Sequence, residues 1–458
     1  MNFSIFGLED RLLQGIQATA FTNPTPIQER TIPVALSGAD ILGCAQTGTG
    51  KTAAFVIPTL HRLAQAQQSQ EHRKGFRPLR ALILSPTREL VQQIEEHVRA
   101  LARFLPLRIC TIYGGMSIDN QIRQLKTGMD IIVATPGRLI DLLNRKSLSL
   151  SNLEILVLDE ADRMLDMGFI HDVRKIVAQT PPQRQTLLFS ATMSPQIQSL
   201  TRAIQNVPTM IEIGERRKPA ESVTQHFYSV PQAGKIDLLL HILKTEAMES
   251  VLVFSRTKHG ADRIAQRLER DGLKSVAIHS NRTQPQRQRA LAGFRAGQFK
   301  ILVATDVAAR GIDVDGISHV INFDIPEAAE DYIHRIGRTG RANTTGDALT
   351  FVASDEHHNL RKIERHIGKR LQMKQYPGFE YSQRSEERSA HGQHGTHGRS
   401  ANTRAEKPRS TQREHGHEHR TLHPPAEHSR YPARTPKPRT TRLDGKHRET
   451  AHRSSRVL

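Results

Sequence analysis

Cysteines and long hydrophobic runs are both scarce in this chain. Its 458 residues include two cysteines, Cys44 and Cys110, whose separation fits no metal-binding spacing. This count excludes a disulfide framework and suits a reducing cytosol, so we expect a cytoplasmic protein. No stretch approaches the roughly 18 apolar residues of a membrane span. The first residues, MNFSIFGLEDRLLQ, carry acids early and no continuous apolar core, so we expect no secretory signal either.

Acidic residues are too few to balance the basic ones. The chain has 65 Lys or Arg and 46 Asp or Glu, which gives a net charge of +19 and an isoelectric point near 10.3. Such an excess predicts a polyanionic partner, most simply a nucleic acid.

The C-terminal segment is short of large apolar residues. Residues 382–458 hold 17 Lys or Arg and eight Asp or Glu, a net charge of +9, among many His, Ser, Thr and Pro. Such a segment buries too little surface to offset its chain entropy, so we expect a disordered basic tail. The charge predicts a sequence-independent tether for nucleic acid, and the alternative is a solvated tail that only aids solubility. HGQHGTH (391–397) and HGHEH (415–419) could chelate metal, but without a folded second shell we expect no dedicated metal site.

Short apolar runs alternate with expected amphipathic helices, one of them RELVQQIEEHVRALARFL from residue 88. The alternation occurs twice, which predicts an α/β protein with two parallel-sheet domains. The first series of expected strands is DILGCA (40–45), RALILS (80–85), RICTIY (108–113), DIIVAT (130–135), EILVLD (154–159) and TLLFSA (186–191). The second is SVLVFS (250–255), SVAIHS (275–280), KILVAT (300–305), HVINFD (319–324) and ALTFVA (348–353). GERRKPAES (214–222) is polar and contains Gly and Pro, which is typical of an interdomain linker.

A glycine-rich loop follows the first expected strand. Residues 45–52 read A-Q-T-G-T-G-K-T, a phosphate-loop pattern with Ala in place of the usual first Gly. Gly48 and Gly50 let backbone N–H groups converge on phosphate oxygens at a helix N-terminus. Lys51 would meet the β- and γ-phosphates, and Thr52 would offer Mg²⁺ a hydroxyl. The alternative is an ordinary glycine-rich turn.

Three carboxylates follow the apolar run ILVL at 155–158. Asp159 ends a strand of the same expected sheet, at the edge where α/β folds bind their ligands. Asp159 would hold Mg²⁺ through its water shell, since Mg²⁺ prefers few carboxylates together with phosphates. Glu160 could orient or deprotonate the attacking water. The alternative is a polar loop after a core strand.

Together, the loop and the DEAD sequence at 159–162 resemble the DEAD-box family of ATP-dependent RNA helicases. The resemblance covers about residues 1–375 and keeps the family's motif order. Further matching motifs are PTREL (86–90), GG (114–115), TPGR (135–138), SAT (190–192), VFSRT (253–257), ATDVAARGIDV (304–314) and HRIGRTGR (334–341). One tripeptide such as SAT is a weak signal, whereas the ordered set is specific. Because the family also begins its loop with Ala, Ala45 supports the resemblance.

The resemblance implies two tandem RecA-like domains, each a parallel sheet flanked by helices. Residues 1–213 would form the ATP-binding domain, with the adenine-reading Gln motif at 1–28, and residues 223–381 the C-terminal helicase domain. The implied activity is RNA-dependent hydrolysis of ATP with Mg²⁺. The implied partners are RNA and ribonucleoprotein complexes, with no membrane and a monomeric chain. The short N-terminus and compact core are most similar to the bacterial RhlE-type subgroup.

The family's nucleotide residues are carried over by motif. The catalytic set is Lys51, Asp159, Glu160, Arg338 and Arg341, with the two arginines meeting charge on the transferring phosphoryl group. The nucleotide contacts are Phe3, Gln28, Ala45, Gln46, Thr47, Gly48, Thr49, Gly50, Lys51, Thr52 and Asp313, and the metal contacts are Thr52 and Asp159. Gln28 would read adenine because a carboxamide both donates and accepts. Phe3 would stack on the base, with Phe6 as an alternative and plain core packing as another.

The coupling and RNA residues follow in the same way. Asp162, Ser190, Thr192 and His334 would couple hydrolysis to domain closure. The RNA contacts would be Thr87, Arg88, Gly115, Thr135, Pro136, Arg138, Arg256, Thr257, Arg287 and Thr305. These mostly small or hydroxyl side chains suit recognition of phosphates and 2′-hydroxyls, although each Thr or Gly alone could be a turn residue. HSNRTQPQR (279–287) departs from the family, with Ser280 for the usual Gly and Pro285 shortly before Arg287.

Three functions use such residues. The first is an ATPase that closes two domains over RNA and unwinds short duplexes or remodels RNA–protein complexes. The second is an ATP-gated RNA clamp or chaperone with little strand separation. The third, a DNA-directed translocase, is disfavoured by the combination of DEAD, SAT and Gln28.

Overall fold

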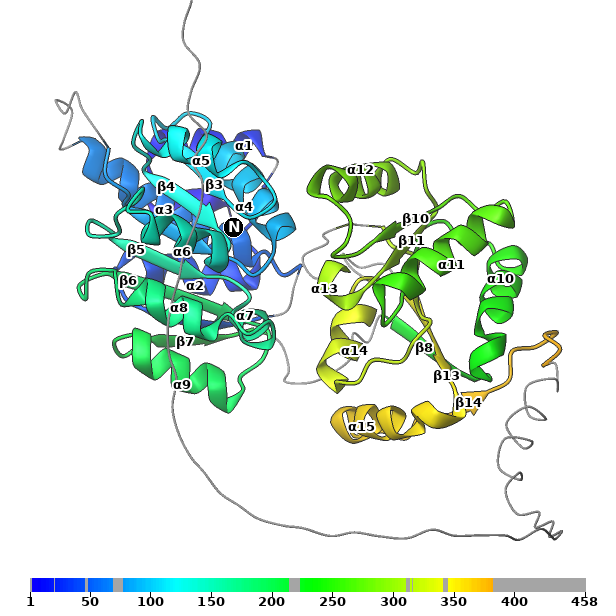
Figure 1. Ribbon diagram of the computed structural model, residues 1–458. Helices are drawn as coiled ribbons and strands as arrows, with labels where there is room; N and C mark the ends of the chain where they lie inside the picture. The colour runs from blue at the N-terminus through cyan, green and yellow to red at the C-terminus, as the bar shows by residue number, and fades with distance from the viewer. Residues whose placement is uncertain are drawn as a thin grey trace, which may run out of the picture. The chain divides into compact units, whose positions relative to one another are not determined.

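A computed structural model describes residues 2–19, 21–45, 48–68, 77–213, 223–309, 314, 316–340 and 345–381. The described residues form two seven-stranded sheets, and all strand pairs in both sheets are parallel (Figure 1). The parallel-sheet prediction for both domains is therefore confirmed. The expected linker (214–222) and tail (382–458) lie outside the described residues.

The first sheet has the order β3-β4-β2-β5-β6-β1-β7. Its strands are β1 (Ile41–Cys44), β2 (Ala81–Leu84), β3 (Ile109–Ile112), β4 (Ile131–Ala134), β5 (Ile155–Leu158), β6 (Gln185–Ser190) and β7 (Thr209–Glu212). Every residue of β1, β2, β4, β5 and β6 is buried, as expected for strands covered on both faces.

Helices cover both faces of the first sheet. On one face, α1 (Asp10–Ala18), α2 (Pro26–Leu36), α3 (Lys51–Gln68) and α4 (Arg88–Leu101) share a core with alternate strand residues such as Ile83 and Val157. The other face carries α5 (Ile118–Leu125), α6 (Pro136–Asn144), α7 (Ala161–Asp166), α8 (Ile170–Val177) and α9 (Pro195–Ile204). Leu82 and Leu156 belong to that second core. The period-two alternation along each strand thus separates the two layers.

The second sheet has the order β10-β11-β9-β12-β13-β8-β14. Its strands are β8 (Val223–Ser229), β9 (Val251–Phe254), β10 (Ser275–Ile278), β11 (Ile301–Ala304), β12 (His319–Asn322), β13 (Gly346–Val352) and β14 (Met373–Lys374). Eleven of the fourteen strands coincide with an expected run, and β7, β8 and β14 were not expected.

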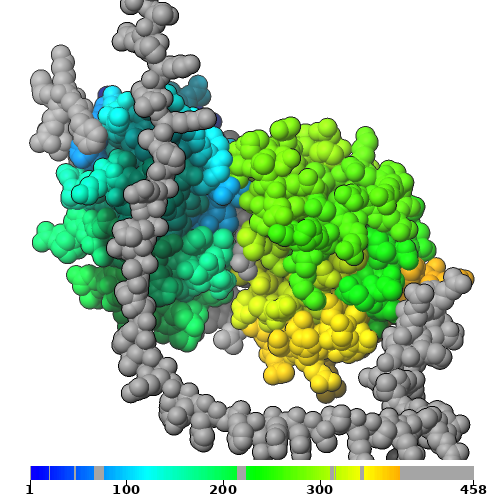
Figure 2. Space-filling view, viewed as in Figure 1, coloured from blue at the N-terminus to red at the C-terminus, as the bar shows by residue number. Residues whose placement is uncertain are grey.

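The helices of the second domain also form two layers. One face carries α10 (Lys235–Thr245) and α11 (Lys258–Arg270). The other carries α12 (Gln284–Arg295), α13 (Asp306–Ala309), α14 (Ala329–Ile336) and α15 (His357–Ile367). The space-filling view shows α15, in yellow, on the surface of this domain (Figure 2). None of the helices in the described ranges is long and apolar enough to cross a bilayer.

Candidate active site

The phosphate loop connects β1 to α3 at the carboxyl edge of the first sheet. Gly48 and Gly50 have φ values of 84° and 92°, which disfavour side chains. A Cβ on Gly50 would also lie 2.5 Å from Gln28 Nε2. Lys51 is buried as the first residue of α3, and its Nζ donates to the Ala45 carbonyl at 2.9 Å. The loop thus holds its lysine inward, while Gln46 and Thr47 lie outside the described residues.

Gln28 joins the start of α2 to the phosphate loop. Its Oε1 accepts from Thr25 N at 3.0 Å, and its Nε2 donates to the Gly50 carbonyl at 3.1 Å. Thr25 Oγ1 makes a parallel contact by donating to the Thr49 carbonyl at 2.9 Å. A carboxamide has two donors and two acceptor lone pairs, so each end of Gln28 retains capacity for one further bond.

Phe3 lies in a short 3₁₀ helix (Phe3–Phe6) and is 3% exposed. Its ring belongs to the core between α1 and the sheet, and Phe6 packs against it at 6.2 Å between ring centroids. Phe6 is the more exposed of the two rings. Base stacking by Phe3 stays a prediction, and both alternatives stated for it are compatible with this geometry.

Asp159 and Glu160 follow β5 directly and are both buried. Asp159 Oδ1 has no hydrogen-bond partner. Burial raises the pKa of Asp159 to about 7, against the lowering influence of the Lys51 charge. Glu160 has a φ of 54°, a strained value for a side-chain-bearing residue that recurs at functional sites. Its Oε2 lies 3.3 Å from Arg163 Nε without hydrogen-bond geometry, so the contact is an ion pair.

This carboxylate pair fits a divalent cation bound together with phosphate. A buried carboxylate oxygen without a partner is destabilised until a cation or proton meets it. Thr52 is the second residue of α3, next to Lys51. Within the described ranges, no three His, Cys, Asp or Glu residues cluster to hold a metal by themselves. Mg²⁺ prefers few carboxylates together with phosphate and water oxygens, which suits a cation at Asp159.

Replacing Asp159 by Asn should stabilise the metal-free protein and do so more at higher pH. The wild-type carboxyl binds a proton more tightly in the folded state, so the fold loses stability as pH rises from 3.8 to about 7. The variant lacks this loss, so above pH 7 its free energy of unfolding should exceed that of the wild type by on the order of 1–4 kcal/mol. Chemical denaturation in EDTA between pH 4.5 and 8 measures the difference. A difference that stays constant over this range would contradict the prediction.

Asp162 connects the carboxylate segment to the end of β6. Its Oδ2 accepts from Ala191 N and Thr192 N, each at 3.0 Å, and from Thr192 Oγ1 at 3.3 Å. Ser190 Oγ donates to the Thr192 carbonyl at 2.7 Å. Asp162, Ser190 and Thr192, expected to act together, therefore form one hydrogen-bonded unit beside Asp159 and Glu160.

The arginine motif lies at the end of α14 in the second domain. Arg338 is 5% exposed, and its Nε donates to the His334 carbonyl at 3.3 Å. Arg335, which the sequence gave no role, binds both oxygens of Asp306 at 2.6 and 2.7 Å. The other two expected residues, Arg341 and Asp313, lie outside the described residues. The motif spacing HRxxR could have pointed to Arg335, because it repeats an arginine at one-turn intervals.

The first-domain RNA candidates lie where strands β2, β3 and β4 end. Thr87 caps α4 by accepting from Leu90 N at 3.3 Å. Gly115 has a φ of 87°, and a Cβ there would lie 2.3 Å from Arg88 Nη1, so the glycine makes room for that guanidinium. Thr135 is the N-cap of α6, and Pro136 is its first residue. Five of the six first-domain candidates therefore lie at the carboxyl edge of the first sheet, because each closely follows the end of one of these strands.

Arg138, the sixth, extends from the first turn of α6. Its Nη1 donates to the Met116 carbonyl and to Gln121 Oε1, both at 3.0 Å. These bonds fix the guanidinium next to the loop after β3, near Gly115 in the chain.

The second-domain RNA candidates also follow strand ends. Thr257 caps α11 by accepting from Gly260 N at 2.9 Å, and Thr305 follows β11 as a buried residue. Pro285 falls in the first turn of α12, where a missing N–H is tolerated. Arg287 therefore stays helical, with its N–H bonded to the Thr283 carbonyl at 3.0 Å. The departure at Pro285 does not disturb the backbone at Arg287.

Comparisons with known proteins identify the family of this chain. The family model described as DEAD/DEAH box helicase matches residues 25–200, and that described as helicase conserved C-terminal domain matches residues 234–343. The chain is 43% identical over 378 residues to "ATP-dependent RNA helicase CshA" of Listeria monocytogenes, covering 82% of this chain and 71% of that protein. It is 45% identical over 372 residues to "ATP-dependent RNA helicase RhlB" of Pseudomonas syringae, covering 81% and 93%. Among solved structures, it resembles "S. cerevisiae Dbp5 bound to RNA and ADP BeF3", with a TM-score of 0.72, 31% identity, and coverage of 82% of this chain and 95% of that one.

Proposed function

This chain belongs to the DEAD-box family of ATP-dependent RNA helicases, and we propose which of its residues perform the reaction. Its activity is that of an ATP-dependent RNA helicase, which hydrolyses ATP when stimulated by RNA. The observation that carries the residue assignment is the buried pair Asp159 and Glu160 at the end of β5. Lys51 lies close enough for its charge to lower the pKa of Asp159, against the larger effect of burial. Two carboxylates and a cation at the carboxyl edge of a parallel sheet suit phosphoryl transfer to water.

In this proposal Glu160 is the general base and Lys51 is the phosphate ligand. Glu160 takes the proton of the attacking water, from a position whose backbone is left-handed directly after β5. Lys51 releases the Ala45 carbonyl and moves to the β- and γ-phosphate oxygens. Arg338 and Arg341 supply fixed positive charge to the transferring phosphoryl group.

Mg²⁺ would be held by Asp159 and by the hydroxyl of Thr52. Bound there, Mg²⁺ supplies neutralising charge to the phosphate oxygens. The unpartnered Asp159 Oδ1 supports this assignment, because the burial that raises its pKa is offset when a cation is present.

The nucleotide base and sugar would be bound by residues of both domains. Gln28 pairs with adenine through its remaining donor and lone pair while it keeps its bond to Gly50. Phe3 or Phe6 packs against the base. Asp313 meets the ribose, and residues 45–52 hold the phosphates.

RNA would be bound through its backbone. The candidates Arg88, Arg138, Arg256 and Arg287 offer guanidinium groups, and the Thr and Gly candidates offer hydroxyls and N–H groups. Such groups contact phosphates and 2′-hydroxyls without reading bases, so we propose little sequence specificity in the core.

The setting of the reaction is also proposed. The two cysteines are free and buried, which suits the reducing cytoplasm. We propose a monomer that works on RNA and within ribonucleoprotein complexes. The RhlE-type subgroup stays a prediction.

The Asp162 unit would transmit the nucleotide state to the rest of the protein. Asp162 accepts hydrogen bonds from Ala191 N and Thr192 N, the first two residues after β6. Through these bonds a change at Asp159 or Glu160 would reach the segment after β6. His334 would complete the coupling from the second domain. This suits an enzyme that strains a duplex, and equally a clamp that hydrolysis resets.

The number of RNA strands released per ATP hydrolysed distinguishes a helicase that separates strands from an ATP-gated RNA clamp. A short labelled RNA duplex and a single-strand trap, followed together with phosphate release, give this ratio. We expect duplex release on the timescale of turnover. A long-lived RNA complex that hydrolyses ATP without releasing strands would identify a clamp.

Truncation after Glu380 tests the proposed role of the tail. The tail has a net charge of +9, so it should raise the local concentration of RNA without changing the chemistry. The truncated protein should need more RNA for half-maximal ATPase activity, with turnover at saturating RNA little changed. Each lost phosphate contact should flatten the log–log salt dependence by roughly 0.7 for single-stranded RNA. Identical RNA dependence and salt slopes for both proteins would leave the tail without a role in binding.

A further inference from the structure

Two buried ionisable residues, neither of which belongs to a sequence motif named above, contact each other next to Arg256. Lys235, the first residue of α10, is 0% exposed, and Glu356, just before α15, is 3% exposed. Charged side chains are rarely buried so completely unless they are paired. We propose that Lys235 and Glu356 are positioning residues that hold the Arg256 guanidinium in place for an RNA phosphate. The proposal rests on the RNA contact proposed above for Arg256.

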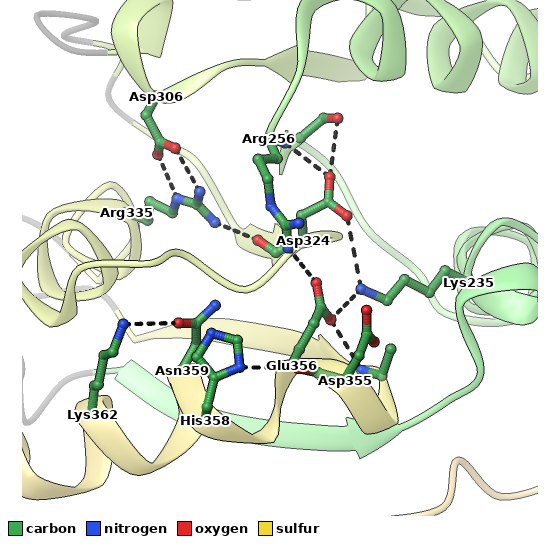
Figure 3. A network of polar contacts seen from close by, with 12 residues as sticks. Lys235, Arg256, Asp306, Asp324, Arg335, Asp355, Glu356, His358, Asn359 and Lys362 are labelled. Atoms are coloured by element: carbon green, nitrogen blue, oxygen red, sulfur yellow. Dashed lines mark hydrogen bonds and ion pairs between the residues drawn. The ribbon is translucent and has the colours of Figure 1, made fainter.

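Glu356 is fixed at both carboxylate oxygens. Its Oε2 accepts from Lys235 Nζ at 2.6 Å and from Ala353 N at 3.0 Å (Figure 3). Its Oε1 accepts from Arg256 Nη2 at 2.5 Å. The carboxylate therefore cannot rotate to follow Arg256, and instead sets the place of that guanidinium.

Asp324, which follows β12, holds the backbone of the same arginine. Its Oδ2 accepts from Arg256 N at 2.8 Å and from Ser255 Oγ at 3.2 Å. Its Oδ1 lies 3.8 Å from Lys235 Nζ. The single amine of Lys235 is thus shared by the carboxylate that holds the Arg256 side chain and the one that holds its main chain.

Exposure separates the supporting residues from the one that can meet a ligand. The side chains of Lys235, Glu356 and Asp324 are at most 12% exposed, whereas that of Arg256 is 46% exposed. A guanidinium carries five N–H donors, so one that is held at Nη2 can still present others to a phosphate. Holding the side chain beforehand lowers the entropy lost when RNA binds.

Net charge gives an opposite prediction, which makes the proposal testable. Lys235 and Arg256 balance Asp324 and Glu356, so Glu356→Gln adds one net positive charge near the RNA candidates. By charge alone, this variant should bind RNA more tightly. If Glu356 positions Arg256, the variant should bind RNA more weakly despite the added charge.

The experiment measures RNA-stimulated ATPase activity of Arg256→Ala, Glu356→Gln and the double variant against RNA concentration and salt. Loss of one charge-assisted hydrogen bond should raise the half-saturating RNA concentration on the order of tenfold in Arg256→Ala. We expect a rise of at least threefold in Glu356→Gln, with turnover at saturating RNA little changed. The double variant should match Arg256→Ala alone. In each of the three, the salt slope should flatten by about 0.7.

Lys235→Met/Glu356→Gln removes both charges of the buried Lys235–Glu356 pair and leaves Asp324 its hydrogen bonds from Arg256 N and Ser255 Oγ, in case Glu356→Gln alone does not fold. It should show the same weakened RNA dependence. Lys244→Met removes a lysine from an exposed ion pair with Asp271 in the same domain and serves as the matched control. Thermal unfolding of every variant shows whether it is folded at the assay temperature.

The outcomes separate this inference from the proposed RNA contact. If Arg256→Ala leaves the RNA dependence unchanged, the contact itself is wrong. If Arg256→Ala weakens binding but the folded Glu356 variants bind RNA as well as the wild type or more tightly, the positioning role is overturned. Effects of Arg256→Ala and Glu356→Gln that add in the double variant would overturn it as well, because the two residues would then act independently.

Discussion

Replacing Arg338 by Ala should lower RNA-stimulated ATP turnover by roughly 10³–10⁵-fold. Arg338 lies at the end of α14, held at Nε by the His334 carbonyl, about 290 residues after Lys51 in the chain. A guanidinium held in this way can stabilise the charge on the transferring phosphoryl group once the two domains close over ATP. RNA that contacts both domains should favour closure, which is why hydrolysis should depend on RNA.

Single-turnover ATP hydrolysis at saturating RNA measures this effect. Arg338→Lys keeps the charge without the planar donor fork, so it should recover only part of the rate. Arg361→Ala removes an exposed arginine of α15 and should leave the rate near that of the wild type. Full RNA-stimulated activity in a fragment of residues 1–213 would contradict the requirement for the second domain.

The central strands could be predicted because they are buried on both faces. Runs such as Ile-Leu-Val-Leu at β5 are continuously apolar, and burial on both sides leaves no polar alternation to confuse the pattern. The missed strands lie at or next to a sheet edge. Thr209 and Met210 of β7 are exposed, β14 has two residues, and β8 mixes exposed polar residues with Phe227 and Tyr228. Their pairing depends on the neighbouring strand, which local sequence does not encode.

The helix from residue 88 shows the usual uncertainty at helix ends. The apolar pattern predicted a helix through Leu105, whereas α4 ends at Leu101. Leu105 N bonds to the Ala102 carbonyl in a turn, and the chain leaves Phe104 exposed. Leu105 is nevertheless buried, so the apolar pattern of the sequence extends beyond the end of the helix at Leu101.

The site was predictable in its motifs and not in its supporting contacts. Gly50, Lys51 and Asp159 follow from the chemistry of phosphate and metal binding. Lys235 and Glu356 do not, because a charged residue in a helix or a turn normally faces solvent. Their burial follows from the tertiary structure, which brings together the segments that contain Lys235, Arg256 and Glu356.

Replacing Glu160 by Gln should leave ATP binding largely intact while lowering turnover by about 10²–10⁴-fold. The carboxamide has nearly the same shape, so it tolerates the αL backbone at this position, but it cannot take a proton from water. Lys51→Ala should instead weaken nucleotide binding, since it removes the charge that meets the phosphates. Fluorescent-nucleotide titration and phosphate release at saturating RNA separate these two effects.

Glu154 lies at the other end of β5 from Glu160 and offers a control. It precedes β5 at the opposite end, where its half-exposed carboxylate pairs with Arg80, so Glu154→Gln should hydrolyse ATP at nearly the wild-type rate. Glu160→Gln also removes the charge that faces Arg163, which is buried, so thermal unfolding must show that the variant remains folded. If the folded Glu160→Gln protein hydrolyses ATP at close to the wild-type rate with RNA present, Glu160 is not the base. The proton would then have to leave through another group at the end of β5, of which Asp159 is the nearest in sequence.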